Sequence, residues 1–239
     1  MNYTISRSRR RTTIGIKIEQ GEVRVMAPTG LASQRIADFV ASKHNWIQQH
    51  VTAQQARLSP LPKRQWQHGE HLYWLGQKLQ LQVRPGQRST IDYDATTLSL
   101  NIRLSRRVTR CEDKVRQLVT QWYKEQAQLW LDTTLPQLAA YQELTPGSWR
   151  VSSYRGKWGA CSHSGHLSFS WRLFAAPEWV VRYVVHHELC HLAHFDHSKA
   201  FWQLLHAHDA NLKAAESWLK HHGITLLHDD YFSYVKETE

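Results

Sequence analysis

The segment His187-Glu188-Leu189-Cys190-His191 places two histidines four residues apart, with a glutamate directly after the first. In an α-helix, positions four apart lie about 40° apart around the axis, so both imidazoles project from one face and can bind one cation. Zinc takes neutral imidazole nitrogens at about 2.0 to 2.1 Å, and this spacing supplies two of them. The pattern therefore predicts a helix, and we expect it to run from Glu178 to about His194.

A catalytic zinc site needs a third protein ligand and keeps one position open for water. His194 would lie about 10.5 Å along the helix axis from His187, too far for convergence on one ion. His197 follows the expected end of the helix, where a turn can direct it back. We therefore predict one Zn²⁺ per chain, bound by His187, His191 and His197. Glu188 lies at the edge of that face, where it can accept a proton from a metal-bound water.

The three cysteines do not suggest another metal site or a disulfide framework. Cys111, Cys161 and Cys190 are widely spaced and form no CxxC pair, which argues against a disulfide framework and a cysteine zinc site. His186 and Cys190 share the four-residue spacing, but no third ligand is evident for them. We interpret Cys190 as a small buried residue.

Charge and histidine are distributed in opposite ways along the 239 residues, whose net charge is +10. Before residue 111 there are 18 Lys and Arg against 6 Asp and Glu, whereas 12 of the 16 histidines follow residue 110. The basic run Arg7, Arg9, Arg10 and Arg11 could contact phosphates of a nucleotide or nucleic acid in a salt-dependent way, or form an ordinary solvated surface. No apolar run approaches the roughly 20 residues that span a bilayer, and no apolar segment follows the basic N-terminus. We expect a cytoplasmic protein without membrane association.

Hydrophobic periodicity predicts an α+β fold. Residues 13–26 alternate with the period of two that is typical of a β-hairpin, and helical spacing follows to about residue 57. Further β-like stretches precede residue 105, and 111–131 has helical spacing. We therefore expect residues 1–108 to form a basic, β-rich N-terminal region that includes one helix. A second region, 109–239, is expected to combine a short antiparallel sheet with the metal-binding helix.

The motif His187-Glu188-x-x-His191-x5-His197, followed by Phe201-Trp202, resembles the active-site signature of the YgjP-like metallopeptidases, relatives of the SprT-like zinc proteases. The upstream segments 155–162 and 170–173 are similar to a second motif of that family, with Ala160 where serine is common. The likeness covers nearly the whole chain. It implies zinc on the three histidines, Glu188 as base and a minimal zincin-like core. The metzincin glycine is replaced by His194, no methionine follows residue 26, and Asp196 stands where the family often has asparagine.

Hydrolysis is the predicted reaction, because an open zinc position and a carboxylate activate water but supply no redox chemistry. A peptide or protein is the first substrate class, and an extended peptide could pair with the strand expected over 167–173. Nucleotide phosphohydrolysis and proteolysis at DNA are the alternatives, and a purely structural zinc module would leave Glu188 without a purpose. Arg155 and Lys157 could bind an anion or an oxyanion in a loop near the metal, or lie in solvent. Trp158 and Trp171 are interpreted as core residues rather than stacking surfaces.

Overall fold

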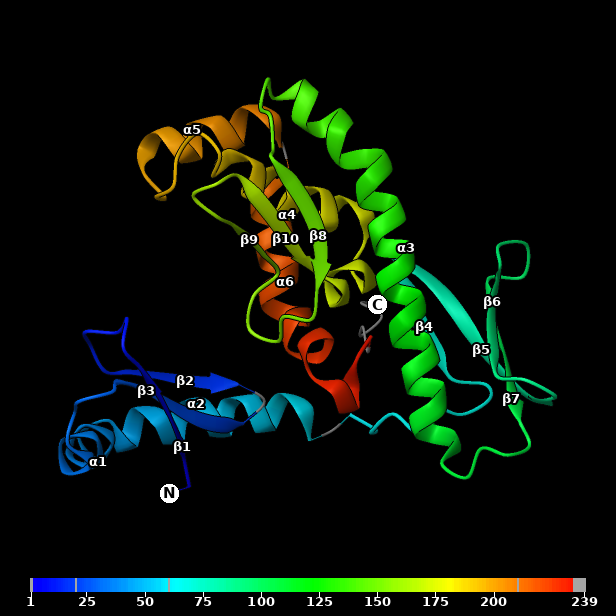
Figure 1. Cartoon of the computed structure of the whole chain (residues 1–239), viewed down its shortest axis with the longest axis horizontal. Helices are drawn as coiled ribbons and strands as arrows, with labels where there is room; N and C mark the ends of the chain where they lie inside the picture. The colour runs from blue at the N-terminus through cyan, green and yellow to red at the C-terminus, as the bar shows by residue number, and fades with distance from the viewer. Residues whose placement is uncertain (1, 20, 60, 210, 234–239) are drawn as a thin grey trace. The chain divides into compact units, whose positions relative to one another are not determined.

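The computed structural model describes residues 2–19, 21–59, 61–209 and 211–233 (Figure 1). The chain forms two compact units, Met1–Lys63 and Arg64–Glu239. Helices and three small sheets occur in one chain, in agreement with the expected α+β class. No helix in the described ranges is both long and apolar enough to cross a membrane.

The first unit pairs a three-stranded sheet with two helices. Strands β2 (Gly15–Glu19) and β3 (Glu22–Pro28) form the predicted antiparallel hairpin, and β1 (Thr4–Ser8) runs parallel to β3 on its other side. Gly21 adopts a φ of 76° at the turn, a conformation that favours glycine. Helices α1 (Ser33–Ser42) and α2 (His44–Leu58) follow. Their apolar faces pack on β3 in a small core made of Val23, Val25, Ala27, Ile36, Val40 and Ile47.

The second unit begins with a four-stranded sheet of order β4-β5-β7-β6. Its strands are β4 (His71–Trp74), β5 (Gln77–Gly86), β6 (Thr90–Asp94) and β7 (Ser99–Ser105), and the long helix α3 (Cys111–Tyr141) follows. Trp74 of β4 contacts Trp122 and Tyr123 of α3, with ring centroids 5.2 and 5.6 Å apart. Because this sheet shares its core with α3, the compact units divide at Lys63, earlier than the boundary expected near residue 108.

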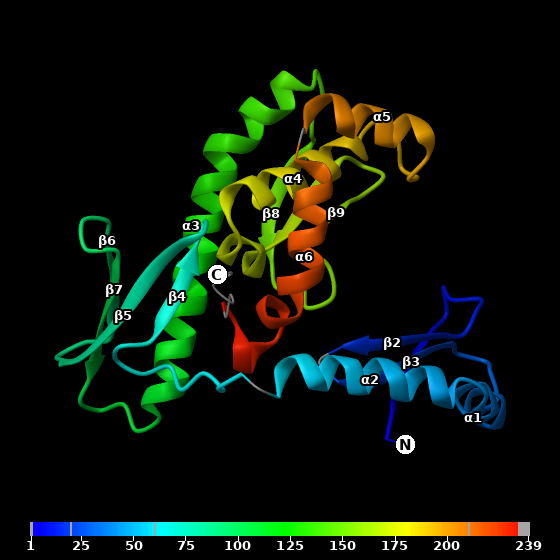
Figure 2. The same cartoon turned by 180° about the vertical axis from the view of Figure 1, so that it is seen from behind.

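A second sheet lies against the other side of α3, as the reverse view also shows (Figure 2). It consists of β8 (Ser148–Ser152), β9 (Gly159–Cys161) and β10 (His166–Ser170), in the order β8-β10-β9. The expectation of an antiparallel sheet was wrong, because β10 runs parallel to β8 and antiparallel only to β9. The strand expected over 167–173 is also shorter and central: it ends at Ser170, where the 3₁₀ helix η1 (Trp171–Ala175) begins, and β8 and β9 form the two edges.

Three helices complete the second unit. They are α4 (Glu178–Cys190), α5 (Lys199–His208) and α6 (Leu212–Leu227), and the short 3₁₀ helix η2 (Asp229–Tyr231) follows. Helix α4 contacts α3, β9, α5 and α6, and Val180, Val181, Val185 and Leu189 are fully buried on it. It ends at Cys190 rather than near His194. The backbone N–H groups of Leu192 and Ala193 bond to carbonyls three residues earlier, instead of the four of an α-helix. The motif therefore lies on the last turn of a buried helix, and the chain can turn back directly after it.

Candidate metal centre

Three histidines converge at the end of α4. His187 lies in its last turn, His191 is the residue that caps its C-terminus, and His197 comes from the connection to α5. One ligand atom from each of the three lies within 4.8 Å of the others. His197 is placed there by the start of α5, since the next residue, Ser198, is the N-cap and accepts the backbone N–H of Phe201. The three predicted ligands therefore form one cluster.

The nitrogen geometry fits a zinc ion. Nε2 of His187 and Nε2 of His197 are 3.1 Å apart. Tetrahedral zinc with nitrogen ligands at 2.0–2.1 Å places neighbouring nitrogens about 3.3 Å apart. Nδ1 of His191 lies 2.9 Å from the backbone oxygen of His194, a contact in which the ring N–H donates. That bond leaves Nε2 of His191 with a free lone pair, as a metal ligand requires. His194 thus contributes its carbonyl to the site and not its ring.

Aromatic packing orients the three rings. The fully buried Phe201 contacts all three, with centroid distances of 5.0 Å to His187, 4.7 Å to His191 and 4.8 Å to His197. Burial, together with the two neighbouring histidines, lowers the pKa of His187 to about 4, and burial also lowers the pKa of His191. Neutral imidazole is the form that binds a metal, so the site is prepared for a cation.

Glu188 projects from the same turn into a closely fitted niche beside β9. A Cβ added at Gly159 would lie 2.6 Å from Oε1 of Glu188, so only glycine leaves room for this carboxylate. The backbone N–H of Cys161 donates a hydrogen bond to it. Burial raises the pKa of Glu188 to about 7, and the charge of Lys157 acts in the opposite direction. The carboxylate is therefore held in one position, next to the histidines but outside their cluster.

Arg155 and Lys157 have separate environments. Arg155 forms an ion pair with Asp229 at 2.5 Å, and it lines a cleft beside α3 that contains none of the three histidines. The ammonium of Lys157 lies 4.3 Å from the ring centre of Tyr154, and its charge reaches Glu188. Trp171 is 4% exposed and packs in the core, as expected.

The four N-terminal arginines belong to the first unit. Arg7 donates hydrogen bonds to the carbonyls of Thr29 and Leu31, at 3.2 and 2.6 Å, and to Oγ of Ser33 at 3.0 Å. Its guanidinium therefore stabilises the turn between β3 and α1. Arg9 and Arg10 are exposed, whereas Arg11 is half-buried beside Gly15.

Sequence reasoning missed the parts of the centre that come from distant segments. Phe201 was noted as part of a motif, but its contact with every ligand ring was not expected. The niche formed by Gly159 and Cys161 also went unrecognised, although a Gly-Ala-Cys segment without large side chains could have suggested close approach by another group. Among the residues that the structure describes, His186 and Cys190 belong to no metal-binding cluster. Nε2 of Gln142 lies 2.8 Å from Nδ1 of His186, and Cys190 is fully buried.

Comparison with known families agrees with this class of site. The YgjP-like metallopeptidase domain model matches residues 12–222. The chain belongs to the YgjP-like family, whose metallopeptidase character implies a divalent metal, typically zinc. Searches of curated proteins and of solved structures find no significant match.

Proposed function

We propose that this chain is a zinc-dependent peptidase in which His187, His191 and His197 hold the metal and Glu188 is the catalytic base. The observation that supports this most strongly is the convergence of three imidazoles beside a buried carboxylate, in a member of a metallopeptidase family. The donor set is the one that catalytic zinc sites use, with three protein ligands and one position left for water or substrate. A minimal zincin-like core is the corresponding fold.

Each side chain has a defined task in peptide hydrolysis. Bound zinc supplies Lewis acidity, which acidifies water and polarises a carbonyl. Glu188 accepts the proton from the attacking water and passes it to the leaving amine. Gly159 and the N–H of Cys161 hold this carboxylate in place, so that little reorganisation is needed when the proton moves.

The substrate strand is expected to lie along β9. Strand β9 is at an edge of its sheet, and its residue Gly159 lies against the carboxylate of Glu188. An extended peptide can add to such an edge through backbone hydrogen bonds, which would bring its carbonyls next to Glu188. The partner in this proposal is therefore an unfolded or extended segment of a protein or peptide.

Nucleotide hydrolysis uses the same activated water and is the alternative. It would need cationic side chains around a polyphosphate at the histidines. Arg155 pairs with Asp229, and Lys157 lies over Tyr154, so these two residues do not form such a clamp. This arrangement favours the peptide.

A parallel substrate screen tests the proposal. The zinc-loaded chain is incubated with an unfolded protein and, separately, with nucleoside triphosphates, and products are identified by mass spectrometry and by phosphate release. We expect new peptide termini that depend on zinc and disappear with a chelator. Release of phosphate or pyrophosphate without any peptide cleavage would contradict the proposal and assign the site to nucleotides.

A further inference from the structure

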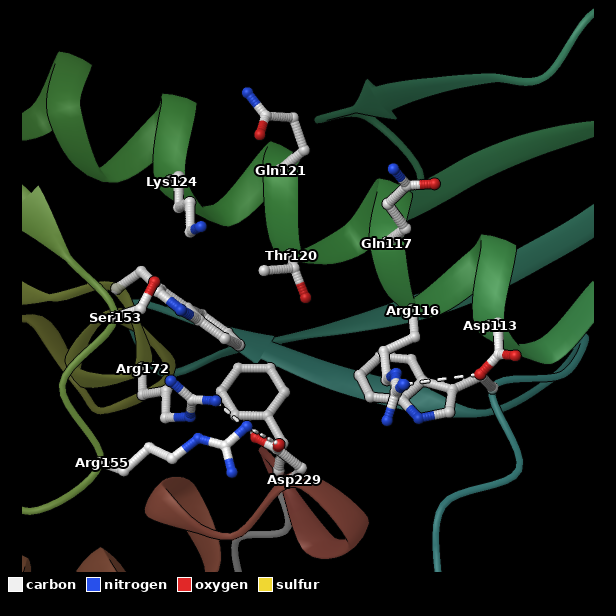
Figure 3. A pocket seen from close by; sticks show the side chains of 13 residues that line it. Asp113, Arg116, Gln117, Thr120, Gln121, Lys124, Ser153, Arg155, Arg172 and Asp229 are labelled. Carbon is white, nitrogen blue, oxygen red and sulfur yellow. Dashed lines mark hydrogen bonds and ion pairs between the residues drawn. The ribbon is translucent and has the colours of Figure 1, made fainter.

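A cleft of about 570 Å³ lies beside α3, lined by residues of that helix, the segment after β8, η1 and the C-terminal part (Figure 3). None of the three histidines and no atom of Glu188 belongs to its lining. Its volume falls within the roughly 300–1,000 Å³ of small-molecule sites. The cleft is therefore large enough for a ligand of its own.

Positive charge exceeds negative charge in this cleft. Its lining includes four cationic side chains and two carboxylates, namely Arg116, Lys124, Arg155 and Arg172 against Asp113 and Asp229. Both Arg155 and Arg172 pair with the single carboxylate of Asp229, as the dashed lines of Figure 3 show. Lys124 forms no ion pair with any described residue. The cleft therefore contains more cationic groups than the carboxylates of the described residues neutralise.

Arg172 is the most demanding of these groups, because its side chain is only 5% exposed. Its Nη2 bonds to Asp229, but Nε and Nη1 are buried and have no hydrogen-bond partner among the described residues. The guanidinium also lies over the ring of Trp171, 4.3 Å from its centre. A buried charge is costly unless it is compensated, and here one carboxylate serves two arginines. A further anion near Arg172 would offset that cost.

The remaining lining suits the uncharged part of a ligand. Trp66, Trp171 and Phe232 form an apolar floor, with centroid distances of 6.4 Å between Trp66 and Phe232 and 4.7 Å between Trp171 and Phe232. Each ring packs in the core and is at most 5% exposed. The hydroxyls of Thr120 and Ser153 are available as donors around the rim. Cationic side chains beside an aromatic floor favour a small organic anion over a bare ion.

We propose that this cleft is a binding site for a small organic oxyanion, whose phosphate or carboxylate group lies near Lys124, Arg155 and Arg172 and whose apolar part covers the aromatic floor. The two kinds of oxyanion share the same recognition chemistry, because guanidinium and ammonium groups donate charge-assisted hydrogen bonds to both. The site is separate from the metal centre, so its occupancy does not depend on the histidines.

Isothermal titration calorimetry of the full chain tests this proposal with three probes: inorganic phosphate, phenyl phosphate and benzoate. We expect saturable binding of phenyl phosphate or benzoate that is tighter than that of inorganic phosphate and weakens with added salt. Binding of phenyl phosphate alone would identify a phosphate site, and binding of benzoate alone a carboxylate site. Absence of binding of all three probes up to about 10 mM, an affinity weaker than the millimolar range, would overturn the proposal.

Variants locate the binding. Because Arg172 is buried, its substitution is expected to destabilise the fold, so the half-buried Lys124 is changed instead. Lys124→Gln is expected to lower the affinity for the probe about tenfold, the equivalent of one hydrogen bond to a charged group. Lys213→Gln on α6 removes the same charge away from the cleft and should leave affinity unchanged. If Lys124→Gln and Lys213→Gln bind the probe with equal affinity, the probe does not bind in this cleft, and the proposal is wrong.

A metal-site variant separates this proposal from the proposed function. The probe should bind His197→Ala as it binds the unaltered chain, since His197 is absent from the cleft lining. Loss of binding in His197→Ala would place the anion at the histidines and overturn the second site. If the unaltered, zinc-loaded chain binds the probe but cleaves no peptide, the result supports the cleft and counts only against the proposed function.

Discussion

The two compact units of this chain differ in their numbers of basic, acidic and histidine side chains. Met1–Lys63 contains 10 Lys and Arg against 3 Asp and Glu, and 2 histidines. Arg64–Glu239 is almost balanced, with 20 against 17, and contains 14 histidines. Exposed charge needs no core, whereas three convergent imidazoles require buried elements that hold them. The histidine cluster therefore lies in the unit with the larger buried core, and the excess of basic side chains lies in the other unit.

The largest expected effect comes from the third ligand. His197→Ala removes one of three metal ligands and should lower zinc affinity by roughly a hundred- to a thousandfold, if the binding free energy of a zinc site is shared among its ligands. His194→Ala is the control, because His194 contributes only its backbone carbonyl. Zinc is measured by elemental analysis after dialysis against a weak chelator. Equal zinc content in the two variants would remove His197 from the site.

A smaller effect is expected from the glycine beside Glu188. Gly159→Ala forces the carboxylate away from its niche, because the new Cβ would lie 2.5–2.8 Å from three of its side-chain atoms. Since a displacement of about 1 Å costs on the order of a hundredfold in rate, we expect a loss of that size in kcat with zinc content unchanged. Gly30→Ala in the first unit is the control, as nothing lies within 4 Å of its Cβ position. Full activity in Gly159→Ala would show that the niche does not position the base.

These two substitutions also show where sequence reasoning ends. The spacing of His187 and His191 determines their common direction on any helix, so that part of the site could be predicted. His197 followed from the distance that excludes His194. The contact between Gly159 and Glu188 joins residues that are 29 positions apart, and the pairing of Arg172 with Asp229 spans 57. Periodicity carries no information about such contacts, because they arise from how the sheet, η1 and η2 pack.

The strand that includes Phe169 shows the same limit at the level of one element. Alternation from Leu167 to Leu173 predicts a single strand, but the structure ends it at Ser170 and buries Trp171 and Arg172 in a 3₁₀ turn. The polar residues of the alternation, Ser168, Ser170 and Arg172, are buried together with the apolar ones. Alternation in the sequence therefore does not mark the residue at which the strand ends.

The smallest effect on catalysis is expected from the first unit. The double variant Arg9→Gln/Arg10→Gln should leave peptide hydrolysis unchanged within about twofold, since surface substitutions rarely shift stability beyond ±0.5 kcal/mol. If these arginines contact phosphates, the same variant weakens binding to duplex DNA and reduces the salt dependence by about two charges. Arg35→Gln on α1 is the comparison for an exposed arginine elsewhere in the unit. DNA binding that is equally strong in all three chains would exclude Arg9 and Arg10 as the contact.

The role of Glu188 in the proton transfer of a zinc peptidase is tested by the cleavage rate of a single variant. The rate of peptide-bond cleavage is compared between the unaltered chain and Glu188→Gln, both loaded with zinc and with the zinc content of each verified. Glutamine has nearly the same shape but cannot accept the proton, so we expect equal zinc content and a rate lower by about 10²- to 10⁴-fold. Equal rates at equal zinc content would contradict this role of Glu188.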